Sequence, residues 1–274
     1  MRAETEQKKV GLLVSIFIAL LGFAGILRAE EWKPDPKLVE LGKKVYNSRC
    51  VICHGEKGDG KGLVGVIHRV EKSGLVWTIY PRDFTSGVFK FRTTPTGCLP
   101  TDEDLVRVVR QGIPRAGMPG HADLSEEEIR AVVEYIKTFS ERWQEEEPCE
   151  SIKVSMPKWV GCPDSVAKGK ELYKKMKCWE CHGMEGKGDG PKADELKDDW
   201  GDKIVPFDFT TGALKMGFQP DRLYLAFTTG LDGSGMPSYE DSLTDEERWH
   251  LVSYTLALMN RLKEIKKYGG GVCK

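Results

Sequence analysis

The sequence predicts an all-α fold of two tandem domains that follow an N-terminal apolar helix. The motif CxxCH occurs twice, at 50–54 and 178–182, and the residues around the first copy are repeated around the second. Apolar residues recur at helical spacing, and no segment has a convincing strand pattern. The predicted parts are an N-terminal segment at 1–31, a first domain at 32–147, a linker at 148–163 and a second domain at 164–274.

Three helices are expected in each half. The first of each set ends at its CxxCH motif, and the second ends at a glycine. The third begins at Ser125 or Thr244, where a hydroxyl cap is followed by acidic residues that complement the helix dipole. The expected ranges are 36–51, 101–112 and 125–143 in the first half, and 164–178, 221–230 and 244–262 in the second.

The CxxCH motif indicates covalent attachment of haem. Two thiols three residues apart on one helical turn can reach both vinyl groups of a haem, and the following imidazole then faces its iron. A zinc site or a CxxC redox pair also uses two cysteines at this spacing, but neither requires the adjacent histidine. The sequence therefore predicts two covalently attached haem c groups, held by Cys50, Cys53 and His54 and by Cys178, Cys181 and His182.

Each half also offers a methionine as the second axial ligand of its iron. Met118 and Met236 both stand in the tripeptide Gly-Met-Pro, and each is followed by an acidic helix start. A thioether is a soft ligand that favours ferrous iron and raises the reduction potential, as suits an electron carrier. Other side chains that could take the sixth position are His68, His121 and Cys98 in the first half, and Met184, Met216 and His250 in the second.

From about Trp32 to its end, the chain resembles the class I cytochrome c family twice over. The resemblance implies a small all-α wrap around one haem in each domain, with His54 and His182 as proximal ligands and Met118 and Met236 as distal ligands. In this family the first helix crosses the last at a small residue and an aromatic one. The residues expected to meet are therefore Gly42 and Tyr46 with Tyr135, and Gly169 and Tyr173 with Tyr254. A weaker likeness, around 89–104, is to membrane-associated respiratory cytochromes.

Four of the eight cysteines remain outside the haem motifs, and an even remainder fits an oxidising compartment. Cys149 and Cys162 are expected to close a short loop at the linker. Cys98 lies in a stretch that is longer in the first half than in the second. We expect it in a disulfide or as a buried thiol, with a thiolate haem ligand, as in dihaem thiosulfate dehydrogenases, as the alternative. The fourth of these cysteines is Cys273.

The N-terminal segment from Val10 to Leu27 carries no charge and follows the pair Lys8-Lys9. As a helix its eighteen residues would span about 27 Å, close to the thickness of a hydrocarbon core. We expect a membrane anchor that leaves the haem domains on the periplasmic side of the bacterial cytoplasmic membrane. A signal peptide cleaved after Ala29 is the alternative, and would give a soluble periplasmic protein.

These observations predict an electron-transfer protein that is not itself an enzyme, because two His/Met irons leave no open position for a substrate. The expected redox partners are a quinol-oxidising or periplasmic oxidoreductase complex and a terminal acceptor. The haems could also relay electrons only inside such a complex. A dihaem enzyme such as thiosulfate dehydrogenase or cytochrome c peroxidase is the alternative, and it needs an open or displaceable ligand. The net charge of −1 argues against nucleic acid as a partner.

A run of lysines before the second motif is a candidate dock for an acidic redox partner, because the haem edge of this family is exposed near its attachment cysteines. These residues are Lys168, Lys170, Lys174, Lys175 and Lys177.

Overall fold

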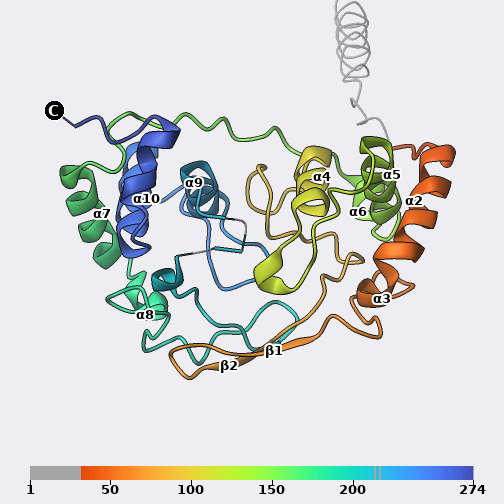
Figure 1. Ribbon diagram of the computed structural model, residues 1–274, viewed down its shortest axis with the longest axis horizontal. Helices are drawn as coiled ribbons and strands as arrows, with labels where there is room; N and C mark the ends of the chain where they lie inside the picture. The colour runs from red at the N-terminus through yellow and green to blue at the C-terminus, as the bar shows by residue number, and fades with distance from the viewer. Residues whose placement is uncertain (1–31, 213, 216, 274) are drawn as a thin grey trace, which may run out of the picture. The chain divides into compact units, whose positions relative to one another are not determined.

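Two helical halves repeat the same order of elements (Figure 1). The computed structural model describes residues 32–212, 214–215 and 217–273, and these belong to one compact unit. The first half contains α2 (Pro36–Arg49), α3 (Val51–His54), α4 (Asp102–Gln111), α5 (Glu126–Lys137) and α6 (Arg142–Glu145). The second contains α7 (Pro163–Lys175), α8 (Trp179–His182), α9 (Pro220–Thr229) and α10 (Asp245–Leu258). Three short 3-10 helices are η1 (Pro114–Ala116), η2 (Phe209–Thr211) and η3 (Leu262–Tyr268).

The starts of the long helices follow from local sequence. Thr101, Ser125 and Thr244 each accept a hydrogen bond from the backbone three residues on, and the acid at that position bonds back to the cap. These capping boxes satisfy amide groups that the first helical turn would otherwise leave unpaired. Helix α2 begins instead at Asp35, whose carboxylate accepts from the amide of Lys37 at 2.9 Å.

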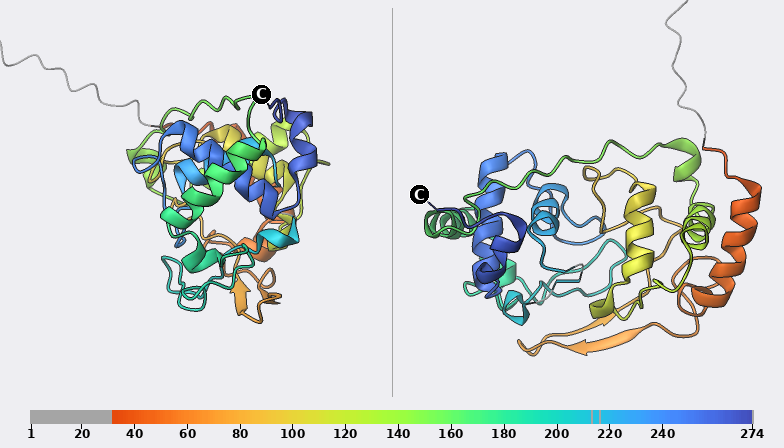
Figure 2. Two further views of the ribbon diagram at one scale, coloured as in Figure 1. Left: turned by 90° about the vertical axis from the view of Figure 1, so that its left-hand side faces the viewer. Right: turned by 45° about the horizontal axis from the view of Figure 1, so that its top comes forward.

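A close crossing of the first and last helices organises each half, α2 against α5 and α7 against α10 (Figure 2). At Gly42 the two backbones approach so closely that an added Cβ would lie 1.9 Å from the carbonyl oxygen of Ala131. The rings of Tyr46 and Tyr135 then meet edge to face with centroids 5.2 Å apart. The expected crossing residues are confirmed here.

The second crossing repeats the first. A Cβ on Gly169 would lie 2.0 Å from the carbonyl oxygen of His250, and the rings of Tyr173 and Tyr254 have centroids 5.3 Å apart. The apolar residues form two clusters, one in each half, that grow outward from these crossings. The fully buried side chains include Tyr46, Leu99, Ile129 and Val132 in the first cluster and Val160, Trp249, Leu251 and Leu256 in the second.

The expectation of an all-α fold is corrected by one β-hairpin in the first half. Strand β1 (Ile67–Val70) pairs antiparallel with β2 (Val76–Ile79). Only the second strand buries one face, through Trp77 and Ile79, while Val76 and Val70 are exposed. Strands of four residues with apolar side chains on both faces give a weak period-2 signal, so the pattern was missed. The described part of the chain is otherwise mostly helical.

The closing helices are shorter than expected. The predicted helix 125–143 is interrupted after Lys137, where the hydroxyl of Thr138 donates to the carbonyl oxygen of Tyr135 at 2.6 Å, and resumes as α6. Such a hydroxyl-to-backbone bond competes with the helical ladder. The predicted helix 244–262 ends at Leu258, just before Asn260 adopts a left-handed φ of 55°.

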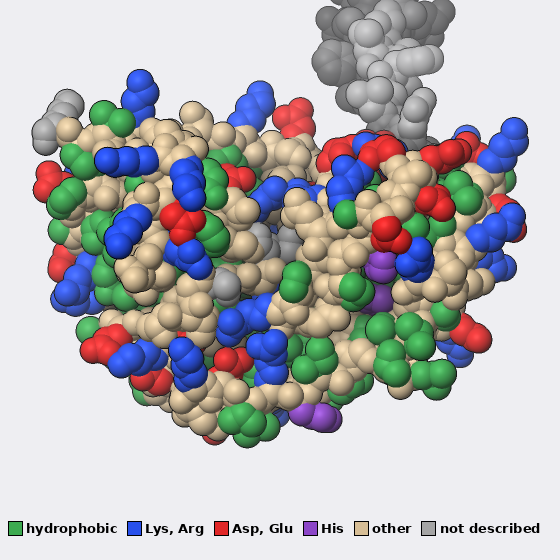
Figure 3. All heavy atoms as spheres, in the orientation of Figure 1, with side chains coloured by type: hydrophobic (Ala, Val, Ile, Leu, Met, Phe, Trp, Pro, Cys, Tyr) green, Lys and Arg blue, Asp and Glu red, His purple; other side chains and the backbone are tan. Residues whose placement is uncertain are grey.

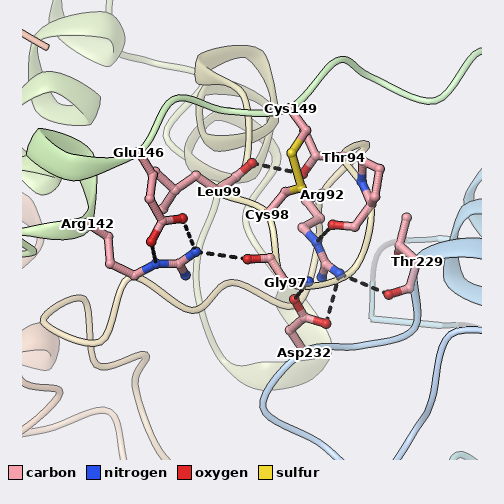
Figure 4. The surroundings of a disulfide bond; sticks show 11 residues. Arg92, Thr94, Gly97, Cys98, Leu99, Arg142, Glu146, Cys149, Thr229 and Asp232 are labelled. Carbon is pink, nitrogen blue, oxygen red and sulfur yellow. Dashed lines mark hydrogen bonds and ion pairs between the residues drawn. A yellow bond between two sulfur atoms is a disulfide. The ribbon is translucent and has the colours of Figure 1, made fainter. Parts of the chain in front are cut away.

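The disulfides differ from the expected pairing of Cys149 with Cys162. Cys98 is bonded to Cys149 (Figure 4), and Cys162 to Cys273. The linker after Cys149 is extended rather than looped, and its Ile152 amide donates to the carbonyl oxygen of Thr93 at 2.8 Å. This extension carries Cys162 away to the start of α7, so the two linker cysteines cannot meet.

The predicted apolar segment Val10–Leu27 lies outside the described residues. Among the helices that the structure does describe, none has the length and apolar character needed to cross a membrane.

Candidate haem sites

The two CxxCH motifs occupy equivalent turns directly after the first helix of each half. The amide of Cys50 donates to the carbonyl oxygen of Tyr46, which continues α2 into α3 and keeps both motif cysteines on one helical turn. The chain leaves the motif under a fixed contact, because the Tyr46 hydroxyl donates to the carbonyl oxygen of Gly55 at 2.8 Å. Tyr173 makes the same bond to Gly183 at 2.7 Å.

The four motif cysteines carry free thiols, although the other four cysteines form disulfides. Burial raises the pKa of Cys50 and of Cys178 to about 11. A catalytic CxxC redox pair needs a thiol with a lowered pKa, so these thiols do not suit that chemistry. No cluster of three or more potential metal-binding His, Cys, Asp or Glu side chains occurs in the described part of the chain, so a zinc site has no support there.

The two motif histidines are oriented identically. The Nδ1 atom of His54 lies 3.0 Å from the carbonyl oxygen of Arg82, and that of His182 lies 3.0 Å from the carbonyl oxygen of Phe207. A carbonyl oxygen only accepts, so Nδ1 carries the proton and Nε2 keeps its lone pair for a metal. Burial also lowers the pKa of both imidazoles, which favours the neutral form that binds iron.

Phenylalanine rings hold these imidazoles in place. Phe84 stacks on His54 with centroids 4.4 Å apart, and Phe209 stacks on His182 at 4.7 Å. These two phenylalanines belong to the repeated Asp-Phe-Thr sequences of the two halves. The repeat therefore supplies the ligand together with the group that orients it.

Both candidate methionines follow a helix-terminating glycine at the same distance. Gly112 ends α4 with φ of 68°, and the amide of Ile113 then donates to the carbonyl oxygen of Met118 at 2.9 Å. Gly230 ends α9 with φ of 63°, and the amide of Leu231 donates to that of Met236 at 3.0 Å. A left-handed φ favours glycine, so each reversal toward a methionine depends on one residue.

The second set of predicted site residues surrounds one cavity of about 250 Å³. Cys178, Cys181, His182 and Met236 all line it, together with mostly apolar neighbours. Two free thiols, a neutral imidazole and a thioether are the donor set of a covalently bound haem with two axial ligands. The residues present therefore fit haem c. The first set, on Cys50, Cys53, His54 and Met118, repeats the local contacts of the second.

Most of the competing ligands lie away from these positions. His250 bonds to Ser165 at the crossing of α7 and α10, and Met184 is 55% exposed. His68 is exposed on the hairpin, where it bonds to Thr78. Met216 lies outside the described residues. Cys98 is bonded to Cys149, so the expectation of a free Cys98 thiolate is wrong.

The lysine run on α7 is largely balanced by carboxylates. Lys174 lies 3.7 Å from Glu171, and Lys175 lies 4.0 Å from Glu247. Lys177, just after the helix, lies 3.7 Å from Glu180. These surface pairs reduce the positive field that an acidic partner would meet. The dock on this helix therefore stays a prediction with little electrostatic support.

Sequence reasoning missed the residues of the first half that reach the second cavity. Its lining includes Glu71, Trp77, Lys90, Phe91 and Arg115, all of which precede the second half in the chain. The only signal was the longer stretch between Phe84 and Met118, which contains two of them outright and one just before its methionine.

Comparisons with known proteins agree with the duplicated geometry. Residues 166–258 match the family model for cytochrome c, and residues 37–136 match that for subunit III of cbb3-type cytochrome c oxidase. A solved chain of the reducing HAO-like protein complex of Kuenenia stuttgartiensis is 44% identical, with a TM-score of 0.74. The match covers 83% of this chain and 99% of that chain.

Proposed function

We propose, from the premise that this chain belongs to the class I c-type cytochromes and is a haem electron-transfer protein, that it relays electrons through two haem c groups. The observation that carries the proposal is the convergence of Cys178, Cys181, His182 and Met236 on one cavity, with the same local contacts repeated in the first half. A bound haem c supplies one-electron redox chemistry in each half.

The protein groups fix the two irons and limit what they can do. His54 and His182 are oriented by carbonyl oxygens, so each presents a neutral Nε2. Met118 and Met236 would fill the opposite positions and favour the ferrous state. With both axial positions occupied, the protein would transfer electrons without binding a substrate at iron. The enzyme alternative needs a ligand that leaves, and the disulfide at Cys98 removes the thiolate that motivated thiosulfate dehydrogenase.

The proposed partner is an HAO-like redox protein that exchanges electrons with this chain. The support is the similarity to a chain of a reducing HAO-like protein complex, which makes complex membership a natural role here. A downstream acceptor would take or supply the electrons at the other end. We place the protein outside the cytoplasm, because two disulfides suit an oxidising compartment, and we propose attachment to the membrane through the segment 10–27.

Exposed apolar side chains around the first motif offer a contact surface for such a partner. Ile52 lies between the two motif cysteines and is 51% exposed, and Leu63, Val64 and Val66 are exposed in the loop that follows. A Cβ on Gly65, in the same loop, would lie 3.1 Å from the Cys53 sulfur, so this loop covers the attachment site. Figure 3 shows hydrophobic side chains gathered on this half of the molecule.

Carbon monoxide binding to the reduced protein tests the proposal. Wild-type protein should carry two haems, stay low-spin and bind no carbon monoxide, because methionine fills each sixth position. Met118→Ala and Met236→Ala should each open one iron, bind one equivalent of carbon monoxide and lower one midpoint potential. Met184→Ala, which changes an exposed methionine, is the matched control and should behave as wild type.

Two results would contradict the proposal. Carbon monoxide or peroxide binding to the wild-type protein would show an open iron and favour the enzyme alternative. A Met118→Ala or Met236→Ala variant that keeps a six-coordinate native spectrum would show that another side chain is the ligand. Membership of a complex is tested separately, because protein extracted from its own membranes should then show a native mass well above that of the chain with two haems.

A further inference from the structure

Three cations meet at the second haem cavity, and two of them come from the first half of the chain. Lys90 and Arg115 belong to the first half, and Lys215 follows η2 in the second. All three line the cavity that also contains His182 and Met236. Figure 3 shows Lys and Arg side chains gathered in the hollow between the two halves.

Protein carboxylates do not balance these charges. Within the described residues, no carboxylate lies within 4.0 Å of the amino group of Lys90 or Lys215, and Arg115 has only Glu71, at 3.5 Å. The amino group of Lys215 lies 4.7 Å from the ring centroid of Trp77, a residue of the other half. A cation over an aromatic face keeps its charge, so the cavity retains an excess of positive charge.

Burial and mutual repulsion show the cost of this arrangement. Burial, and after it the charge of Arg82, lowers the pKa of Lys90 to about 8. Burial, and after it the charge of Lys90, lowers the pKa of Lys215 to about 7. Buried charges are normally paired, so cations gathered in this way indicate an anionic group that completes the site.

The chemistry of the cavity identifies this group. Haem c is held through its two vinyl groups by the motif cysteines, and its two propionate carboxylates lie on the opposite edge of the ring. We propose that Lys90, Arg115 and Lys215 bind the propionates of the second haem, so that the first half of the chain completes the haem site of the second. This inference rests on the proposed function, because it requires haem at Cys178 and Cys181.

The arrangement would link the two halves electrically as well as mechanically. A cation near a haem stabilises the ferrous state, which carries one positive charge fewer than the ferric state, and therefore raises the reduction potential. Residues of the first half would then set the potential of the second haem. They would also hold the two halves in one arrangement, because a single carboxylate-bearing edge would be bound from both sides.

The test is a spectroelectrochemical titration of the holoprotein with Lys90 and Lys215 changed to methionine, singly and together. Methionine keeps much of the side-chain length and removes the charge. The double variant should lower the midpoint potential of one haem, with about a tenfold smaller reduced-to-oxidised ratio at fixed potential, equivalent to 59 mV for a one-electron couple. Lys72→Met, an exposed lysine in the turn of the hairpin, is the control and should change neither haem.

Two further variants assign the effect. Met236→His lowers the potential of the second haem by replacing its thioether, and the haem that shifts in the lysine variants should be that same one. Lys90→Arg and Lys215→Arg keep the charge and should restore the wild-type potential. They also serve where a methionine variant loads haem poorly, because an unchanged potential in the arginine variants beside a lowered one in Lys215→Gln gives the same answer.

Haem content separates the failure of this inference from the failure of the proposed function. Two haems by mass with unchanged potentials in the double variant would overturn the propionate site and leave the electron carrier intact. An equal shift in Lys72→Met, or a shift confined to the first haem, would also overturn it. A wild-type protein without haem at Cys178 and Cys181 would overturn the proposed function itself.

Discussion

The helix crossing at Gly42 should not accept even one methyl group. An alanine Cβ there would lie 1.9 Å from the carbonyl oxygen of Ala131 and 2.9 Å from the Cβ of Tyr135. Both contacts are to rigid parts of α5, so no side-chain rotation relieves them. A carbon normally approaches a carbonyl oxygen to about 3.3 Å, so α2 and α5 would have to separate locally by about 1.4 Å.

The expected loss of stability follows from that separation. A radial gap of about 0.5 to 1 Å already forfeits a quarter to a half of each dispersion contact, and Val45 and Tyr46 make theirs on this face. Overpacking of this kind costs about 1 to 3 kcal/mol and sometimes more, while the helix propensity of alanine returns about 1 kcal/mol. Gly42→Ala should therefore lower the free energy of unfolding by about 2 to 3 kcal/mol.

Urea unfolding of the holoprotein, followed by circular dichroism and haem absorbance, measures this loss. Gly169→Ala makes the same change at the second crossing, where the Cβ would lie 2.0 Å from the carbonyl oxygen of His250, and should cost a similar amount. Gly74→Ala is the control, because a Cβ there meets nothing within 4 Å, although its φ of 85° adds backbone strain. A Gly42→Ala loss below about 0.5 kcal/mol, or below that of the control, would refute the close crossing.

Further changes test the contacts between the halves and the helix starts. Asp232→Ala should lower the free energy of unfolding by about 3 kcal/mol in urea titrations, because the fully buried Arg92 side chain loses its anion at 2.8 Å; a loss like that of a surface pair would contradict the contact. Non-reducing digestion should yield Cys162 and Cys273 in one linked peptide pair, and free alkylation of both would disprove it. Thr101→Ala should cost about 1 kcal/mol by removing a cap, and an unchanged urea midpoint would argue against that cap.

Much of each half could be predicted because its signals are local. The capping residues lie beside the helices they start, and the CxxCH spacing places both thiols on one turn within the sequence itself. The crossing of Gly42 and Gly169 with the closing helices came from a family resemblance, and the backbone distances now explain why only glycine fits there. The Gly112 and Gly230 turns that position the methionines follow from the same duplication.

The disulfides and the hairpin were beyond such reasoning for different reasons. Four cysteines allow three pairings, and the choice depends on whether the linker is looped or extended, which its composition does not state. Contacts such as that of Ile152 with Thr93 decide the matter, and they join residues far apart in the sequence. The hairpin buries only Trp77 and Ile79, too few residues for a clear alternation.

Sequence duplication predicts two equivalent sites, whereas the structure makes them unequal. The matched tryptophans show that the halves exchange contacts, since Trp77 lies under Lys215 and Trp200 lies under Arg82, each cation coming from the other half. The longer loop of the first half then adds contacts that have no counterpart, because Thr96 and Gly97 both donate to Asp232 (Figure 4).

Asp232 stands four residues before Met236, so this loop holds the segment that carries the second distal ligand. Arg92 binds the same carboxylate at 2.8 Å and the carbonyl oxygen of Thr229 at 2.9 Å, just before the glycine that turns the chain toward Met236. The disulfide at Cys98 anchors the loop from behind. The first half thus supports the methionine loop of the second haem, while the reverse support is absent from the described residues of the first methionine loop apart from Arg115, whose guanidinium donates to Thr211. An electron carrier whose two haems share ligand types gains unequal potentials from such one-sided contacts, and that inequality would give the relay its direction.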